Sequence, residues 1–288
     1  MKGRSFKRTI ISILCVLVAA IVAILVHALM PSPGAAMNEE DFDSLLVKMF
    51  GFPAVASSYF ILLYLHILLV LRYFGTRSNM KPKEIGLRFG SAFALIYFMG
   101  MQEVVVESSP FEGWGFDFVQ YQLFMGLGDA IPAFIICVII AIYVLNSGKT
   151  NSHSPSSVQK NKLITVGSIA IVYFCERTLG YTIGYIGSDI ESFPVPVLIW
   201  TAGFGIVFGI AYVLLYPVYY HKNRHTSSWN LTVLTLGINW MIFNSFIGMI
   251  YADTILPMLL RSGVDVAAIY VTAIFLEEWK LRRSKQLT

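Results

Sequence analysis

Long apolar runs with almost no charge are the feature that most limits what this chain can fold into. A helix needs about 20 mostly apolar residues to cross the hydrocarbon core of a bilayer. Backbone groups find no water there, so such a run must satisfy its own hydrogen bonds as a helix. Eight runs fit: residues 9–30, 53–71, 85–106, 121–145, 163–186, 194–220, 231–251 and 255–279. The sequence therefore predicts an all-α, polytopic membrane helix bundle with eight transmembrane helices.

The composition agrees with a membrane protein and excludes two other classes. Hydrophobic residues make up 56% of the 288 residues and charged residues only 13%, whereas a soluble domain carries about 25% charged residues. The net charge of +4 is small, and the basic residues lie at the ends of apolar runs without forming a continuous stripe. We therefore expect the lipid bilayer as the main partner and no binding of nucleic acid.

The charges between the runs alternate in sign, which predicts an orientation. Basic residues gather in the segments 2–8, 72–88, 149–162, 222–224 and 280–285, and acidic residues gather in the intervening segments 39–43, 107–117, 189–191 and 253. Because cytoplasmic loops are rich in Lys and Arg, we expect a multi-pass protein of the cell membrane with both termini in the cytoplasm. The first apolar run is longer than the 7–15 residues of a signal peptide, so we interpret it as a span.

A polar, Ser-rich stretch near the midpoint predicts two halves. Residues 147–161 are expected to form a flexible cytoplasmic linker between a four-helix half at 1–146 and another at 162–288. Two features recur in order: Phe52-Pro53 with Phe193-Pro194, and Gly100-Met101 with Gly248-Met249. Because four spans is an even number, such repeats would be parallel, as in some transporters. Chance similarity between apolar helices is the alternative.

Glu176 and Arg177 are the charges placed deepest in an apolar run. A charge at that depth costs at least ~2.5 kcal/mol on insertion scales. Neighbours on a helix point about 100° apart, so the two side chains cannot simply face each other, and each needs another partner or a wet cavity. One hypothesis is a substrate- or ion-binding site, and the other is a buried network that fixes helix packing.

Asp129 and Asp265 each follow a glycine closely near one end of an apolar run. Asp is a favourable N-cap, so the first interpretation is that both begin helices. The second is that both belong to broken helices whose ends form an ion or solute site. Arg261 precedes Asp265 by one turn, and a pair between them would give this region a structural role.

Several uncharged or titratable side chains complete the candidates. His66 is interpreted either as a proton carrier or as a hydrogen-bonded packing residue. Asn244 fits interhelical packing and a site lining equally well. Gln102 and Glu103 could line a vestibule or mark the water boundary.

No pattern in the chain predicts a metal or an organic cofactor. His221 and His225 have i,i+4 spacing but lack further ligands, and the three cysteines show no metal-binding spacing. The sequence also lacks a P-loop, an H-E-x-x-H string, a G-x-S-x-G string and a dinucleotide fingerprint. The small-residue pairs Gly180-x-x-x-Gly184 and Gly205-x-x-x-Gly209 predict close helix approach.

These observations favour a permease or transport component for a small solute or ion, with its site near Glu176 and Arg177 and no enzymatic activity. One alternative is an intramembrane enzyme that modifies a lipid or isoprenoid, with Glu176 or His66 as acid or base. The other is a non-catalytic assembly or sensor subunit, whose charges pair with a membrane protein partner or with a second copy of the chain.

Overall fold

The computed structural model describes residues 2–29, 42–103, 116–145, 162–219 and 224–285. These parts of the chain are helical and contain no strand. The elements are α1 (Lys2–Leu29), α2 (Leu45–Phe50), α3 (Phe52–Gly75), α4 (Pro82–Gly100), α6 (Phe116–Val144), α8 (Lys162–Thr182), α9 (Pro194–Tyr219), α10 (Arg224–Ser228), a π-helix η2 (Trp229–Gly237), α11 (Ile238–Ile250) and α12 (Ile255–Lys285). The prediction of an all-helical chain is confirmed.

Seven helices in the described parts are long and apolar enough to cross a membrane, with α10, η2 and α11 counted as one. The chain is therefore a multi-pass membrane protein. The remaining predicted span, residues 85–106, corresponds to α4, which begins with Lys83, Glu84 and Arg88 within its first two turns. The count of eight spans stays a prediction, although α4 packs between two candidate spans, α6 and α9.

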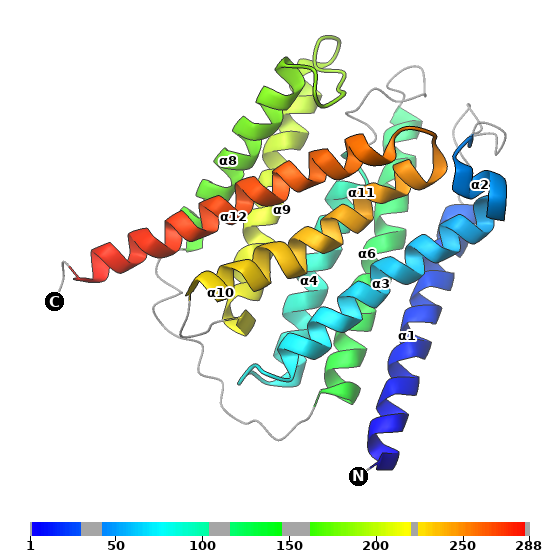
Figure 1. Ribbon diagram of the computed structural model, residues 1–288, viewed down its shortest axis with the longest axis vertical. Helices are drawn as coiled ribbons and strands as arrows, with labels where there is room; N and C mark the ends of the chain where they lie inside the picture. The colour runs from blue at the N-terminus through cyan, green and yellow to red at the C-terminus, as the bar shows by residue number, and fades with distance from the viewer. Residues whose placement is uncertain (1, 30–41, 104–115, 146–161, 220–223, 286–288) are drawn as a thin grey trace.

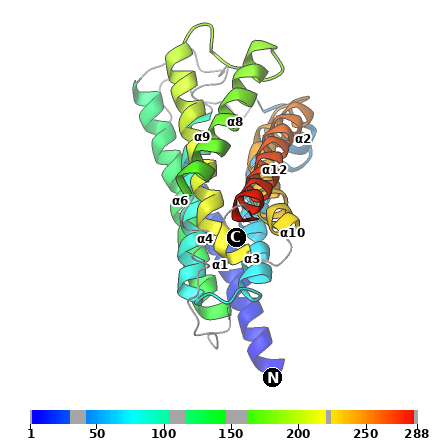
Figure 2. The same ribbon diagram turned by 90° about the vertical axis from the view of Figure 1, so that its left-hand side faces the viewer.

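The eight long helical segments form a closed ring of neighbours. Its order is α1, α6, α4, α9, α8, α12, the η2–α11 segment and α3, which returns to α1. Figure 2 shows this ring flattened into two layers, with α4, α6, α8 and α9 in one and α3, α11 and α12 in the other. We call the side on which α1 begins the N-face, and the side on which α3 begins the far face (Figure 1).

The contacts repeat between the two predicted halves. In the first half α1 contacts α3 and α6, and α4 contacts α6; in the second half α8 contacts α9 and α12, and α11 contacts α12. The contact of α4 with α9 likewise has its counterpart in that of α11 with α3. This pattern is the one that two parallel four-helix repeats would produce, and the repeat itself stays a prediction.

Glycines allow α9 to pack closely against α8 in the second half. A Cβ on Gly205 would lie 2.9 Å from the carbonyl oxygen of Ala170, and one on Gly209 would lie 2.8 Å from that of Val166. The predicted close approach at this pair is therefore confirmed for α9 against α8. The other predicted pair is wrong, because Gly184 lies beyond α8 in a turn with φ of 73°, and a Cβ there would meet nothing within 4 Å.

Gly209→Ala is expected to lower the stability of the purified protein by about 1–3 kcal/mol, since the added methyl would force α9 away from α8. The matched control is Gly167→Ala on α8, where a Cβ meets nothing within 4 Å. Unfolding by titration with a denaturing detergent measures both. Equal midpoints for the two variants would contradict the close packing.

Candidate functional site: a buried network of four charges

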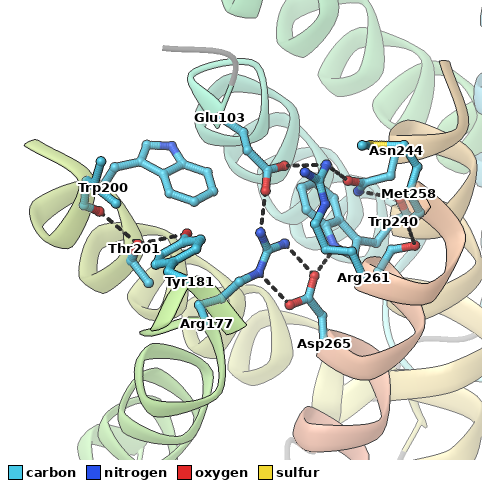
Figure 3. A network of polar contacts seen from close by, with 12 residues as sticks. Glu103, Arg177, Tyr181, Trp200, Thr201, Trp240, Asn244, Met258, Arg261 and Asp265 are labelled. Atoms are coloured by element: carbon cyan, nitrogen blue, oxygen red, sulfur yellow. Dashed lines mark hydrogen bonds and ion pairs between the residues drawn. The ribbon is translucent and has the colours of Figure 1, made fainter. Parts of the chain in front are cut away.

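Four charged side chains from two helices and the end of a third meet in the part of the bundle nearer the far face (Figures 1 and 3). Arg177 lies in the last two turns of α8, and Glu103 follows the end of α4. Arg261 and Asp265 lie one turn apart on α12. All four are at most 5% exposed, and Arg177 and Asp265 are fully buried. We call these four residues the charge network.

Arg177 is held by two carboxylates at once. Its Nε donates to Asp265 Oδ1 at 2.7 Å and its Nη2 to Asp265 Oδ2 at 2.6 Å. Its Nη1 donates to Glu103 Oε1 at 2.5 Å. The planar guanidinium presents its donors in a fork that matches a carboxylate, so the pair with Asp265 fixes α8 against α12. The expectation that Arg177 needs a partner other than Glu176 is confirmed.

Arg261 closes the network on the side of α11. Its Nη2 donates to Asn244 Oδ1 at 2.5 Å and lies 3.5 Å from Glu103 Oε2. The Asn244 amide also donates to the carbonyl oxygen of Trp240 at 2.9 Å. Asn244 is thus tied to its own helix and to the network at the same time.

Aromatic side chains enclose the charges. Trp240 is completely buried, and its indole N–H donates to Asp265 Oδ2 at 2.8 Å. The ring of Tyr173 lies 5.3 Å from the Arg177 guanidinium carbon, a distance at which a cation is attracted to the face of a ring. These aromatic groups exclude water and so strengthen the ionic contacts.

The formal charges of the network cancel, because two guanidinium groups face two carboxylates. Taking ions out of water costs several kcal/mol each, and apolar residues of similar volume often stabilise a protein as well or better. A closed network of this kind is therefore weak evidence for a purely stabilising role. Since the donors of Arg177 and the oxygens of Asp265 occupy one another, a polar solute can bind these two side chains only after the network opens.

Glu176 borders the charge network, because its carboxyl group lies within hydrogen-bond reach of Asp265 and interacts electrostatically with Arg177. It is half-buried, and its Oε1 accepts a bond of 3.4 Å from the hydroxyl of Tyr185. The sequence placed Glu176 and Arg177 in one candidate site, but the structure gives the central position to Arg177 alone.

Asp129 and Asp265 both lie inside continuous helices, so the N-cap interpretation and the broken-helix interpretation are wrong. Asp129 lies within α6 and Asp265 within α12, because each helix begins several residues before its glycine. Each carboxylate instead pairs with a basic residue of the first helix of its own half. Asp129 Oδ1 lies 2.9 Å from Nε2 of His27 on α1. Asp265 pairs in the same way with Arg177 on α8.

His66 is hydrogen-bonded through both ring nitrogens and lies apart from the charge network. Its Nε2 lies 3.1 Å from the carbonyl oxygen of Leu234, and its Nδ1 lies 3.3 Å from the amide nitrogen of Asn239. The Asn239 amide oxygen accepts from the Tyr97 hydroxyl at 2.8 Å. With Nδ1 accepting from the amide, Nε2 donates to Leu234, which is the arrangement of a packing residue.

Sequence reasoning missed two of the pairings. Glu103 was interpreted as a vestibule or boundary residue, although it is a direct partner of Arg177, and nothing in the sequence relates positions on α4 and α8. His27 was not connected with Asp129. Two other sequence expectations lie outside the described residues: the flexible linker at 147–161 and the histidine at 221.

Comparison with known protein families, with curated proteins and with solved structures found no match.

Proposed function

We propose that this chain is a permease for a small polar or charged solute, and that the charge network is a gate that closes the solute path toward the far face. The observation that carries the proposal is the position of Arg177. It connects α8, which belongs to one layer, to α12 in the other layer, through the bidentate pair with Asp265 (Figures 2 and 3).

The chemistry of the network fits a contact that opens and closes. An apolar contact between α8 and α12 would hold the layers together without the desolvation cost of four ions. Ionic contacts, however, can be exchanged for contacts with a solute or with water when the layers separate. A polar or charged solute that binds Arg177 or Asp265 would lower the free energy of the open state relative to the closed state.

The unpaired hydroxyl of Tyr173 supports a solute path on the side of the charge network that faces the N-face. Tyr173 precedes Arg177 by one helical turn and is completely buried, and its hydroxyl has no hydrogen-bond partner among the described residues. A buried hydroxyl without a partner requires an explanation. A solute bound on the N-face side of the closed network would supply a hydrogen-bond partner for this hydroxyl, because it would lie within reach of Tyr173.

The proposal also includes an orientation. With both termini in the cytoplasm of a cell-membrane protein, the network would close the path on the outer side, and the N-face would carry the basic loops that the positive-inside rule requires.

The test is a thermal-stability screen of purified protein against inorganic ions, amino acids, amines, organic acids and sugars. We expect at least one of these classes to raise the melting temperature of the wild type, since a ligand at 100 times its Kd stabilises by about 2.7 kcal/mol. Tyr173→Phe, which removes only the unpartnered hydroxyl, is expected to fold normally and to lose most of that shift.

The matched control for this screen is Tyr219→Phe. It removes another buried hydroxyl, one bonded to Thr235 at 2.6 Å near the N-face, and should leave the solute-dependent shift unchanged. A screen in which no solute shifts the wild type, or in which Tyr173→Phe keeps the full shift, would count against the permease.

A further inference from the structure

A groove opens on the surface of the bundle near the N-face, between the last turns of α3 and the π-helix η2. It has a volume of about 690 Å³ and is bounded by His66, Leu69, Arg72, Tyr73 and Arg77 of the α3 side together with Asn230, Leu234 and Ile238 of the opposite wall. Its volume is in the range of small-molecule sites, and it lies apart from the charge network.

The π-helix accounts for one wall of the groove. In η2 the backbone N–H groups bond to carbonyl oxygens five residues earlier instead of four, as from the N–H of Ile238 to the carbonyl oxygen of Val233. A carbonyl oxygen within the π-helix can therefore accept a hydrogen bond from a side chain of another helix. The Leu234 carbonyl takes that role and lies 3.1 Å from His66 Nε2. Segments of π-helix occur often at functional sites, and here the bond to His66 joins the two walls at the inner end of the groove.

The walls of the groove are suited to an acyl chain. Leu69 is 56% exposed and Ile238 is 37% exposed, although both lie in spans that cross the membrane. From His66 to Gly75 the α3 wall covers 10 residues, which is about 15 Å at 1.5 Å per residue. That length accommodates a lipid headgroup and the upper part of one chain.

The rim of the groove is positively charged. Arg72 forms no side-chain hydrogen bond or ion pair with any other described residue. Arg77 stacks on the ring of Tyr73 with its guanidinium carbon 3.6 Å from the ring centroid, and its Nη1 donates to the Tyr73 carbonyl oxygen at 2.8 Å. This leaves Nε and Nη2 of Arg77 for a ligand. None of the described residues that line the groove is acidic.

We propose that this groove binds an anionic phospholipid from the leaflet at the N-face. The phosphate would lie between Arg72 and Arg77, and the acyl chain would follow Leu69 and Ile238 toward His66. Basic pockets between transmembrane helices are suited to anionic headgroups, and the apolar walls distinguish a lipid from a free phosphate ion. The site does not depend on the permease, because it shares no residue with the charge network.

Native mass spectrometry of the detergent-purified full chain tests the site, with phosphatidylglycerol and phosphatidylcholine added in equal amounts. We expect the wild type to retain phosphatidylglycerol over phosphatidylcholine. The variant Arg72→Gln/Arg77→Gln should lower that preference by about 30-fold, since the two basic side chains together contribute about 2 kcal/mol near an anionic headgroup.

The control variant is Arg282→Gln, which removes an exposed basic residue of α12 outside the groove and should leave the preference unchanged. Inorganic phosphate at millimolar concentration should not displace the lipid if the acyl chain contributes to binding. The proposal is overturned if the double variant retains phosphatidylglycerol as the wild type does, if the control variant loses it equally, or if phosphate alone displaces it. Circular dichroism confirms that the variants are folded.

Discussion

Replacement of Arg177 by methionine is expected to destabilise the protein by about 3–5 kcal/mol, because it leaves the buried carboxylates of Asp265 and Glu103 without their main partner. Both oxygens of Asp265 accept bonds from this one guanidinium. No water can replace those bonds while Asp265 stays fully buried. The measurement is unfolding in mixed micelles by titration with a denaturing detergent.

The matched control for this variant is Arg88→Met, at an ion pair near the N-face. Arg88 lies 3.0 Å from Glu84, and the two side chains are 24% and 36% exposed. An ion pair in contact with water contributes about 0–1 kcal/mol, and Arg88 also donates to the carbonyl oxygen of Leu214. We therefore expect a clearly smaller loss than for Arg177. Similar losses at the two positions would contradict the buried and fully paired state of Arg177.

The second large effect is expected when both partners of the bidentate pair are changed. Asp265→Asn removes the negative charge but keeps an oxygen that can accept the bond from the Trp240 indole. In the double variant Arg177→Met/Asp265→Asn, Glu103 and Arg261 still balance each other. The double variant should therefore be more stable than Arg177→Met alone, with a coupling energy of about 1–3 kcal/mol.

The double-mutant cycle separates pairing from packing. If Arg177 acts mainly by filling space, the losses of the two single variants will add in the double variant, since neither change restores volume. If Arg177 acts mainly by pairing with Asp265, the losses will be clearly non-additive. Additive losses would remove the physical basis for the network as a switchable contact.

The sequence predicted the helices well because apolar length alone defines a span. The starts expected at Pro53 and Pro194 agree with helices that begin at Phe52 and Pro194, since proline fits the first turn of a helix. The π-helix at 229–237 was not predictable, because nothing in its sequence distinguishes it from an ordinary span. It depends on tertiary contacts such as the bond to His66.

The site was predicted only in part. The cost of an unpaired charge identified Arg177 as a residue that needs a partner, but not which residue would supply it. Asp265 was expected as a cap because Asp near a glycine favours a helix start, and a charged partner on another helix overrides that local preference. The pairing of Glu103 with Arg177 joins residues 74 positions apart, and a single sequence carries no signal for it.

A distance measurement between α8 and α12 tests whether the charge network holds a gate between these two helices. Spin labels would be placed at Leu179 of α8 and Leu256 of α12, which are 60% and 63% exposed, after Cys15, Cys137 and Cys175 are replaced by alanine. Pulsed electron paramagnetic resonance in nanodiscs then gives the distribution of distances between the labels, both in the otherwise unchanged protein and in the Asp265→Asn variant.

The gate predicts a second, longer distance whose share rises in Asp265→Asn, because the weakened contact with Arg177 favours separated layers. A folded Asp265→Asn variant with the same single distance as the wild type would contradict the gate and would identify the charge network as a fixed clamp between the two helices.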